Sequence, residues 1–207
     1  MALVDDLVEK GALKNPNLIR AFRAVDRWDF VPEPMKDFAY VDEPLAIGEG
    51  QTISQPWTVA FMLELLSPSP GDNIMEVGYG SGWQTALLAY VGANVYAVER
   101  IPKLCEWGKR NVEKCGFRGV KFFCQDGTMG LPDIAKRVGG FDKIIAAASG
   151  RELPPAWKNQ LKTGGKIIAP IGHSIFEFTK RTKAAFDAFP HHSFAFVPLI
   201  SDNDSKW

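Results

Sequence analysis

The chain has 207 residues, of which 46% are hydrophobic and 23% are charged, as is ordinary for a water-soluble globular protein. Lysine plus arginine and aspartate plus glutamate each number 24, so no overall basic field favours a nucleic acid or an anionic membrane. No apolar run approaches the roughly 20 residues of a membrane span, and the N-terminus lacks a signal-peptide pattern. We therefore expect one domain over residues 1–207 that binds neither nucleic acid nor membrane.

The cysteines bear on the cellular compartment. Cys105, Cys115 and Cys124 are an odd number of cysteines and lack metal-ligand spacing. We interpret them as buried or incidental thiols of a protein kept in a reducing cytosol. The sequence therefore predicts a cytoplasmic protein without a metal site.

Helices and loops are expected over residues 1–70. Residues 3–11 place apolar side chains at helical spacing and stop at a glycine, and a second helix is expected to begin near Pro16. The aromatic, proline-interrupted stretches 28–33 and 39–45 are expected to be loops or extended segments. These segments predict a cap laid over a main sheet.

A glycine-containing loop is expected at residues 47–56, where it leads into a helix from Trp57 to Leu66. Pro56 suits the first turn of that helix, and Ser54 stands where an N-cap serine would. Capping is the commoner role for such a serine when only sequence features are weighed. Ser54 is therefore first a candidate N-cap.

Short apolar segments alternate with helical segments from residue 71 to about residue 171. The expected strands are 73–77, 94–99, 120–124, 141–148 and 166–171, and the expected helices are 84–91, 103–114 and 153–161. Three later segments lack intervening helices and predict antiparallel strands at a sheet edge, at residues 176–181, 185–189 and 194–199. The predicted fold over residues 71–207 is α/β and Rossmann-like, with helices on both faces of a mostly parallel central sheet and antiparallel C-terminal strands.

A glycine-rich turn follows the first of these strands. Gly78, Gly80 and Gly82 allow backbone N–H groups to approach a ligand closely, at the carboxyl end of a strand where open α/β sheets bind ligands. Trp83 fills the place of the third glycine in a dinucleotide fingerprint, so an oxidoreductase is a remote alternative. The chain also lacks the P-loop pattern.

Two acids accompany this turn. Glu76 lies inside the first strand, and Glu99 closes the next apolar run about 20 residues on, the usual distance for an acid that binds ribose hydroxyls. Together with the three glycines they suit a nucleoside ligand that has no pyrophosphate. The arrangement resembles the S-adenosylmethionine site of Rossmann-like methyltransferases, and a glycine-rich turn without a ligand is the alternative.

Residues 50–56 read Gly-Gln-Thr-Ile-Ser-Gln-Pro. This stretch resembles the signature of the protein-L-isoaspartate (D-aspartate) O-methyltransferases. Support comes, in chain order, from residues 30–32, 42–45, 99–102, 126–127, 160–165 and 196–199. The resemblance covers nearly the whole chain, whereas the glycine motif alone would name only the superfamily.

The resemblance implies an enzyme that uses S-adenosyl-L-methionine to methylate the α-carboxylate of L-isoaspartyl residues in damaged proteins. The ester then collapses to a succinimide, which partly reopens as aspartate. Carried over by position, Ser54 is the catalytic hydroxyl. The implied cofactor-binding residues are Thr52, Ile53, Ser54, Glu76, Gly78, Gly80, Gly82, Glu99, Asp126 and Gly127. The implied substrate-binding residues are Ser54, Val197, Pro198 and Leu199, with the tail after them.

This chemistry needs neither a metal nor a general base, because a carboxylate with a pKa near 4 is already ionised at pH 7. Catalysis can come from holding the nucleophile, methyl and sulfur in line, and Ser54 would orient the substrate carboxylate by a hydrogen bond. We interpret His173, His191 and His192 as structural or surface residues. The expected partners are isoaspartyl proteins or peptides, and we expect a monomer.

Three segments depart from the family pattern and keep alternatives open. Tyr79 stands where the family usually has a small threonine or serine, which prompts the alternative of a cofactor-binding relative without turnover. Residues 147–150 replace a Thr-Ala-Gly-Ala type stretch, and residues 189–193 are unusual for the family. These two segments prompt the alternative of a carboxylate methyltransferase with a dedicated peptide or protein substrate.

Overall fold

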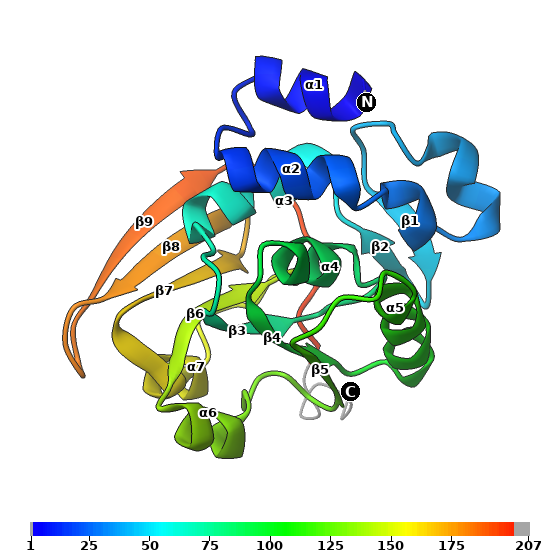
Figure 1. The fold of residues 1–207 in the computed structure, drawn as a ribbon. Coiled ribbons are helices and arrows are strands. Elements are labelled where there is room, and N and C mark those ends of the chain that lie inside the picture. Colours follow the sequence, from blue (N-terminus) through cyan, green and yellow to red (C-terminus); the bar gives the residue numbers. More distant parts are fainter. Residues whose placement is uncertain (1, 201–207) are drawn as a thin grey trace.

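A computed structural model describes residues 2–200, and a seven-stranded sheet forms its centre (Figure 1). The strands are β1 (Leu45–Gly48), β2 (Gln51–Ile53), β3 (Asn73–Val77), β4 (Asn94–Glu99), β5 (Val120–Cys124), β6 (Phe141–Ala146), β7 (Leu161–Ile171), β8 (Ser174–Lys180) and β9 (Phe186–His192). The α-helices are α1 (Ala2–Glu9), α2 (Pro16–Ala24), α3 (Pro56–Leu66), α4 (Trp83–Tyr90), α5 (Pro102–Lys114), α6 (Pro132–Val138) and α7 (Pro155–Gln160). Two 3-10 helices are η1 (Arg27–Phe30) and η2 (Glu33–Phe38).

The strand order in the sheet is β5-β4-β3-β6-β7-β8-β9. Strands β3 to β7 pair in parallel, and β8 and β9 add to β7 as antiparallel strands. This confirms the expected mostly parallel sheet with an antiparallel C-terminal edge. The chain runs from β3 outward to β4 and β5 and then returns to β6 on the other side of β3. The carboxyl end of β3 is therefore a topological switch point, where open α/β sheets bind ligands.

Two hydrophobic cores lie on opposite faces of the sheet. Successive side chains of a strand point to opposite faces, so Ile74 joins one core and Met75 the other. Helices α1 to α5 contribute to the Ile74 side, and α6 and α7 to the Met75 side, as Figure 1 shows above and below the sheet. The expectation of helices on both faces is confirmed.

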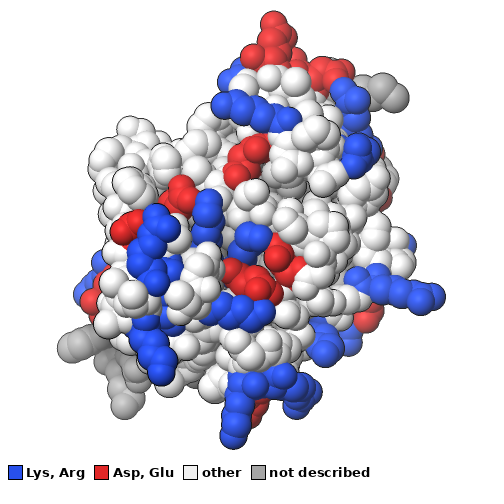
Figure 2. All heavy atoms as spheres, turned by 60° about the vertical axis from the view of Figure 1, so that its left-hand side comes forward, with Lys and Arg blue, Asp and Glu red and all other residues white. Residues whose placement is uncertain are grey.

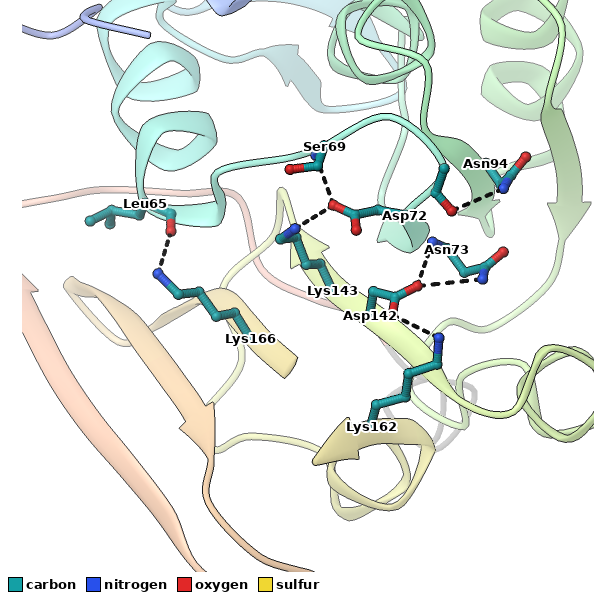
Figure 3. Close-up of polar contacts among 10 residues, drawn as sticks. Leu65, Ser69, Asp72, Asn73, Asn94, Asp142, Lys143, Lys162 and Lys166 are labelled. Carbon is teal, nitrogen blue, oxygen red and sulfur yellow. Dashed lines mark hydrogen bonds and ion pairs between the residues drawn. The ribbon is translucent and has the colours of Figure 1, made fainter. Parts of the chain in front are cut away.

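A polar network ties together the amino-terminal edge of the sheet (Figure 3). Asp142 of β6 accepts hydrogen bonds from the Asn73 backbone N–H of β3 at 2.8 Å and from Lys162 Nζ of β7 at 2.7 Å. Lys143 forms an ion pair with Asp72 just before β3. These contacts connect the amino-terminal ends of β3, β6 and β7.

Charges of both signs mix on the surface. On the face in Figure 2, basic side chains lie beside acidic ones. Within residues 2–200 no helix is both long and apolar enough to span a membrane.

The segment before β3, residues 2–70, has more regular structure than the predicted loops. Residues 45–53 form the antiparallel hairpin β1–β2, and residues 27–38 contain the two 3-10 helices. Ser54 is not the N-cap of α3, which is Gln55. The Asp42 side chain satisfies an N-terminal donor of this helix instead, because its Oδ1 accepts the Trp57 N–H at 2.8 Å. The capping interpretation of Ser54 was wrong, because the side chain that accepts the Trp57 N–H is Asp42, 15 residues earlier in the sequence.

One more prediction needs correction at the end of the chain, and one helix before β6 was missed. Residues 194–199 do not form a strand, and only Pro198 makes a bridge, to Ser149. Helix α6 was not predicted, because its seven residues offer little periodicity. The tail expected to border the substrate extends into residues 201–207, which lie outside the described residues.

Candidate active site

The glycine turn after β3 is packed tightly against helix α5. Gly78, Gly80 and Gly82 all have positive φ, at 82°, 49° and 87°. A Cβ on Gly82 would come within 2.5 Å of Val112 Cγ2, and one on Gly108 within 2.2 Å of the Gly80 carbonyl oxygen. Positive φ therefore favours glycine at all three turn positions, and the close approach of α5 requires it at Gly82 and Gly108.

A cavity, the turn cavity, opens beside this turn at the carboxyl ends of β3 and β4. Its lining includes eight predicted site residues: Thr52, Gly78, Gly80, Glu99, Gly127, Val197, Pro198 and Leu199. It also includes Ile200, the first residue of the tail that was expected to border the substrate, and Ala147 and Ala148 of the segment that departs from the family pattern. The lining residues for which no role was predicted are Ile47, Gln51, Val77, Val98, Arg100, Ile101, Leu104 and Gln125. Many of these are apolar residues that single-sequence patterns cannot distinguish from core residues.

Glu99 ends β4 with its carboxylate at the turn cavity. Its Oε2 accepts the Gly80 N–H at 3.0 Å, and its Oε1 accepts the N–H groups of Arg100 at 2.8 Å and Ile101 at 3.0 Å. The residue is only 7% exposed. A carboxylate has about four lone-pair sites, so these three donors orient it and leave acceptor capacity for a ligand hydroxyl.

Tyr79 is absent from the lining of the turn cavity but contributes to the lining of a second, inner cavity, described next. Its hydroxyl donates to the Cys105 carbonyl oxygen at 2.8 Å, and its ring meets the edge of Phe122 at a centroid distance of 5.4 Å. Burial and the nearby Glu99 raise the pKa of the Tyr79 hydroxyl. The ring that replaces the family's small residue therefore packs between the turn, α5 and β5.

A second cavity, the inner cavity, lies next to the turn cavity between β2 and α4. Its lining includes Ile53, Ser54 and Glu76. Glu76 is fully buried, and its carboxylate accepts hydrogen bonds from Thr85 Oγ1 at 2.6 Å and Gln84 Nε2 at 3.0 Å. Burial raises the pKa of Glu76 to about 7, although these two hydrogen bonds oppose the rise.

A third cavity, the outer cavity, lies on the other side of Ser54. Its walls carry aromatic side chains, among them Trp57 and Phe194, whose rings stack at a centroid distance of 6.1 Å. Thr52 and Ala147 line all three cavities, and Ser54 lines the inner and outer ones. Ser54 thus lies between the inner and outer cavities, two residues after Thr52, which also lines the turn cavity.

Two predicted site residues line neither the turn cavity nor the inner cavity. Gly82 faces α5, as described above, and the Asp126 carboxylate accepts the Thr128 N–H at 2.8 Å. Gly82 serves the shape of the turn, and Asp126 helps to shape the loop that presents Gly127. Across residues 2–200 no cluster of His, Cys, Asp and Glu could hold a metal ion.

The interpretation of the cysteines as thiols was wrong for two of the three. Cys105 in the first turn of α5 and Cys124 at the end of β5 form a disulfide, and Cys115 remains free. An odd count with no recognisable spacing hid this pair, because only the packing of α5 beside β5 brings the two residues together.

Comparison with known proteins identifies the family. A family model described as protein-L-isoaspartate(D-aspartate) O-methyltransferase matches residues 1–204. The chain is 43% identical over 196 residues to a protein-L-isoaspartate O-methyltransferase of Methanospirillum hungatei, which covers 93% of this chain and 89% of that protein. It is 42% identical over 206 residues to the Pyrococcus horikoshii enzyme of the same name, covering 97% and 92%.

Solved structures agree with the sequence comparison. A crystal structure described as a Plasmodium falciparum protein-L-isoaspartate O-methyltransferase in complex with S-adenosyl-L-homocysteine matches with a TM-score of 0.84 at 26% identity, covering 96% of this chain and 97% of that chain. A second protein-L-isoaspartate O-methyltransferase matches with a TM-score of 0.86 at 28% identity, covering 97% and 66%. With its glycine turn, acid and signature hairpin around one set of cavities, this chain belongs to the protein-L-isoaspartate(D-aspartate) O-methyltransferase family.

Proposed function

We propose that this chain transfers the methyl group of S-adenosyl-L-methionine to the α-carboxylate of L-isoaspartyl residues in damaged proteins. The observation that carries the proposal is the position of residues 50–56, which begin in the β1–β2 hairpin and lead into α3. Thr52 lines the turn cavity, while Ser54, two residues on, lines the outer cavity. Strand β2 and the residue directly after it thus border both the nucleoside-type cavity and the adjoining space for a polypeptide.

The turn cavity suits the proposed methyl donor. Gly78 and Gly80 expose backbone there, and Glu99 offers acceptor capacity for ribose hydroxyls. Ile101 and Leu104 add apolar wall, which suits a purine ring. When bound, the donor supplies a methyl group on a positively charged sulfur that a carboxylate can attack directly.

Ser54 would act by orienting the substrate. Its hydroxyl has no hydrogen-bond partner within residues 2–200, so it is available to donate to one oxygen of the substrate carboxylate. The other oxygen would then point toward the junction at Thr52 and Ala147. Because the carboxylate is ionised at neutral pH, no proton has to be removed, and the serine contributes by alignment.

The substrate would lie in the outer cavity. Val197 lines both this cavity and the turn cavity, and its carbonyl oxygen accepts the Ser149 N–H at 2.8 Å. Leu199 N–H in turn donates to the Ser149 carbonyl oxygen at 2.8 Å. These bonds hold the 197–199 segment beside both cavities, in agreement with the proposed substrate-bordering role.

We also propose a monomeric, cytoplasmic enzyme, although the disulfide removes the cysteine argument for a reducing compartment.

The test is a pair of peptides that differ only in the linkage at one residue. With labelled S-adenosyl-L-methionine, a peptide with an isoaspartyl residue should accept the methyl group and its aspartyl twin should not. Equal labelling or none would reject the proposal. Several flanking sequences should be used, because labelling confined to one sequence would instead indicate a dedicated substrate. If calorimetry shows that S-adenosyl-L-homocysteine binds while neither peptide is labelled, the chain is a cofactor-binding protein without turnover.

A further inference from the structure

We propose that Arg27 is a positioning residue for Ser54, and that its guanidinium holds the Ser54 backbone, directly after β2, in the geometry that methyl transfer requires. This inference rests on the proposed function, because it assigns a support to the hydroxyl that would orient the substrate. Arg27 is the first residue of η1 and is only 2% exposed.

The guanidinium binds four main-chain carbonyl oxygens from two segments. Nη1 donates to Ala39 at 2.8 Å and to Val41 at 3.1 Å. Nη2 donates to Glu43 at 2.9 Å and to Ser54 itself at 3.1 Å. One side chain therefore joins the 39–43 segment to Ser54, which lies 27 residues after Arg27 in the sequence. Nε is buried and has no partner within residues 2–200.

The segment that Arg27 holds also grips the chain just beyond Ser54. Asp42 lies between the bound carbonyls and accepts the Trp57 N–H of α3 at 2.8 Å. Ser54 is thus held on its own carbonyl by Arg27, and three residues later through Asp42. This double attachment restrains the backbone but leaves the serine side chain available.

The same guanidinium reaches the glycine turn. Its Cζ lies 5.4 Å from the ring centroid of Trp83, the first residue of α4. The indole Nε1 donates to the Val25 carbonyl oxygen at 3.3 Å, which anchors the ring to the end of α2. Arg27 therefore packs over the Trp83 ring in a cation–π contact. Through this contact Arg27 links α4, the helix after the glycine turn, to Ser54.

Lysine cannot reproduce this arrangement. A guanidinium is a planar fork with five donors, whereas an ammonium offers three donors from one point. Arg27→Lys would keep the charge but release some of the four carbonyls, so the Ser54 backbone could shift. A misplacement of about 1 Å can cost about 100-fold in rate. The turn cavity does not include Arg27 in its lining, so cofactor binding should change little.

The experiment compares Arg27→Lys, Ser54→Ala and the double variant with the isoaspartyl peptide. We expect Arg27→Lys to lower kcat by about 10- to 100-fold, with the Kd for S-adenosyl-L-homocysteine within about threefold of wild type. In the Ser54→Ala background the same substitution should have little further effect, because the two residues act as a unit. Arg23→Lys is the control, since Arg23 is an exposed partner of Asp5 and should retain full activity.

Two outcomes would overturn the inference. If Arg27→Lys only lowers the melting temperature and keeps full kcat per folded molecule, Arg27 is merely structural. If its loss is undiminished in the Ser54→Ala background, it does not act through Ser54. Should Arg27→Lys not fold, Asp42→Ala releases the same backbone from the α3 side and must show the same pattern. Failure of the wild-type enzyme to methylate the peptide would instead reject the proposed function.

Discussion

The carboxylate of Glu99 accepts a hydrogen bond from the Gly80 backbone N–H at 3.0 Å, so the acid that ends β4 and the turn that follows β3 form one unit. This contact orients Glu99 toward the turn cavity before any ligand is bound. Preorganisation of this kind lowers the entropy that a ligand must lose on binding. The contact also means that Glu99 supports the turn it faces.

Substitution Glu99→Ala should therefore weaken cofactor binding. Hydrogen bonds to a charged group contribute about 1.5–3 kcal/mol, so the Kd for S-adenosyl-L-homocysteine should rise about 10- to 100-fold in calorimetry. At saturating cofactor, turnover should be much less affected. Glu106→Ala is the control, because Glu106 is an exposed partner of Arg110 on α5. An unchanged Kd would show that Glu99 does not contact the ligand.

Substitution Ser54→Ala should give the opposite pattern. Loss of a hydrogen bond to the substrate carboxylate should lower kcat/KM for the isoaspartyl peptide by about 10- to 100-fold. The affinity for S-adenosyl-L-homocysteine should stay near wild type. Ser69→Ala, at an exposed serine in the loop after α3, is the control and should behave as wild type in both assays. A large loss of cofactor affinity with normal turnover would contradict the proposed role.

Glu76 predicts a pH dependence of stability. Its pKa is raised by burial from an ordinary 4.5 to about 7, so the folded protein binds this proton more tightly than the unfolded chain. The resulting stabilisation is fully present below pH 4.5 and is lost as the pH rises through about 7. Relative to Glu76→Gln, the wild type should lose on the order of 2–3 kcal/mol of unfolding free energy between pH 5 and pH 8.

Urea denaturation at several pH values measures this difference. Glu113→Gln is the control, because Glu113 is exposed and forms an ion pair with Lys109 across one helical turn. Its stability curve should run parallel to that of the wild type. If the Glu76→Gln curve also runs parallel, Glu76 does not change its protonation over this range.

The disulfide predicts a redox-dependent stability. Cys105 and Cys124 are 19 residues apart, and cross-links closing loops of this length typically contribute about 3 kcal/mol. Cys105→Ser combined with Cys124→Ser should lower the unfolding free energy by about that amount, measured without reductant. Cys115→Ser removes the free thiol and should change little. Equal stability of the double variant and wild type with and without dithiothreitol would argue against the bond.

Local patterns were enough for the sheet and the turn. The strand 73–77, the glycines after it and the acid at residue 99 form a contiguous αβ unit, and the structure places them as predicted. Neighbouring parallel strands end at the same sheet edge, so Gly80 and Glu99 had to meet. Patterns failed where the partner is distant, as at Asp42 and Trp57, which are 15 residues apart. The capping alternative for Ser54 was wrong because no local signal marked Asp42 as the acceptor of the Trp57 N–H.

The amino-acid sequence by itself determined the α/β sheet, the nucleoside-type turn and the family, because strand periodicity, positive-φ glycines and the 50–56 signature are local features. Only the tertiary structure decided where Tyr79 points, which cysteines pair and what holds Ser54. Each of these depends on side chains from separate elements meeting in space. Arg27 shows this most clearly, since its four carbonyl partners follow from how the cap folds over α4.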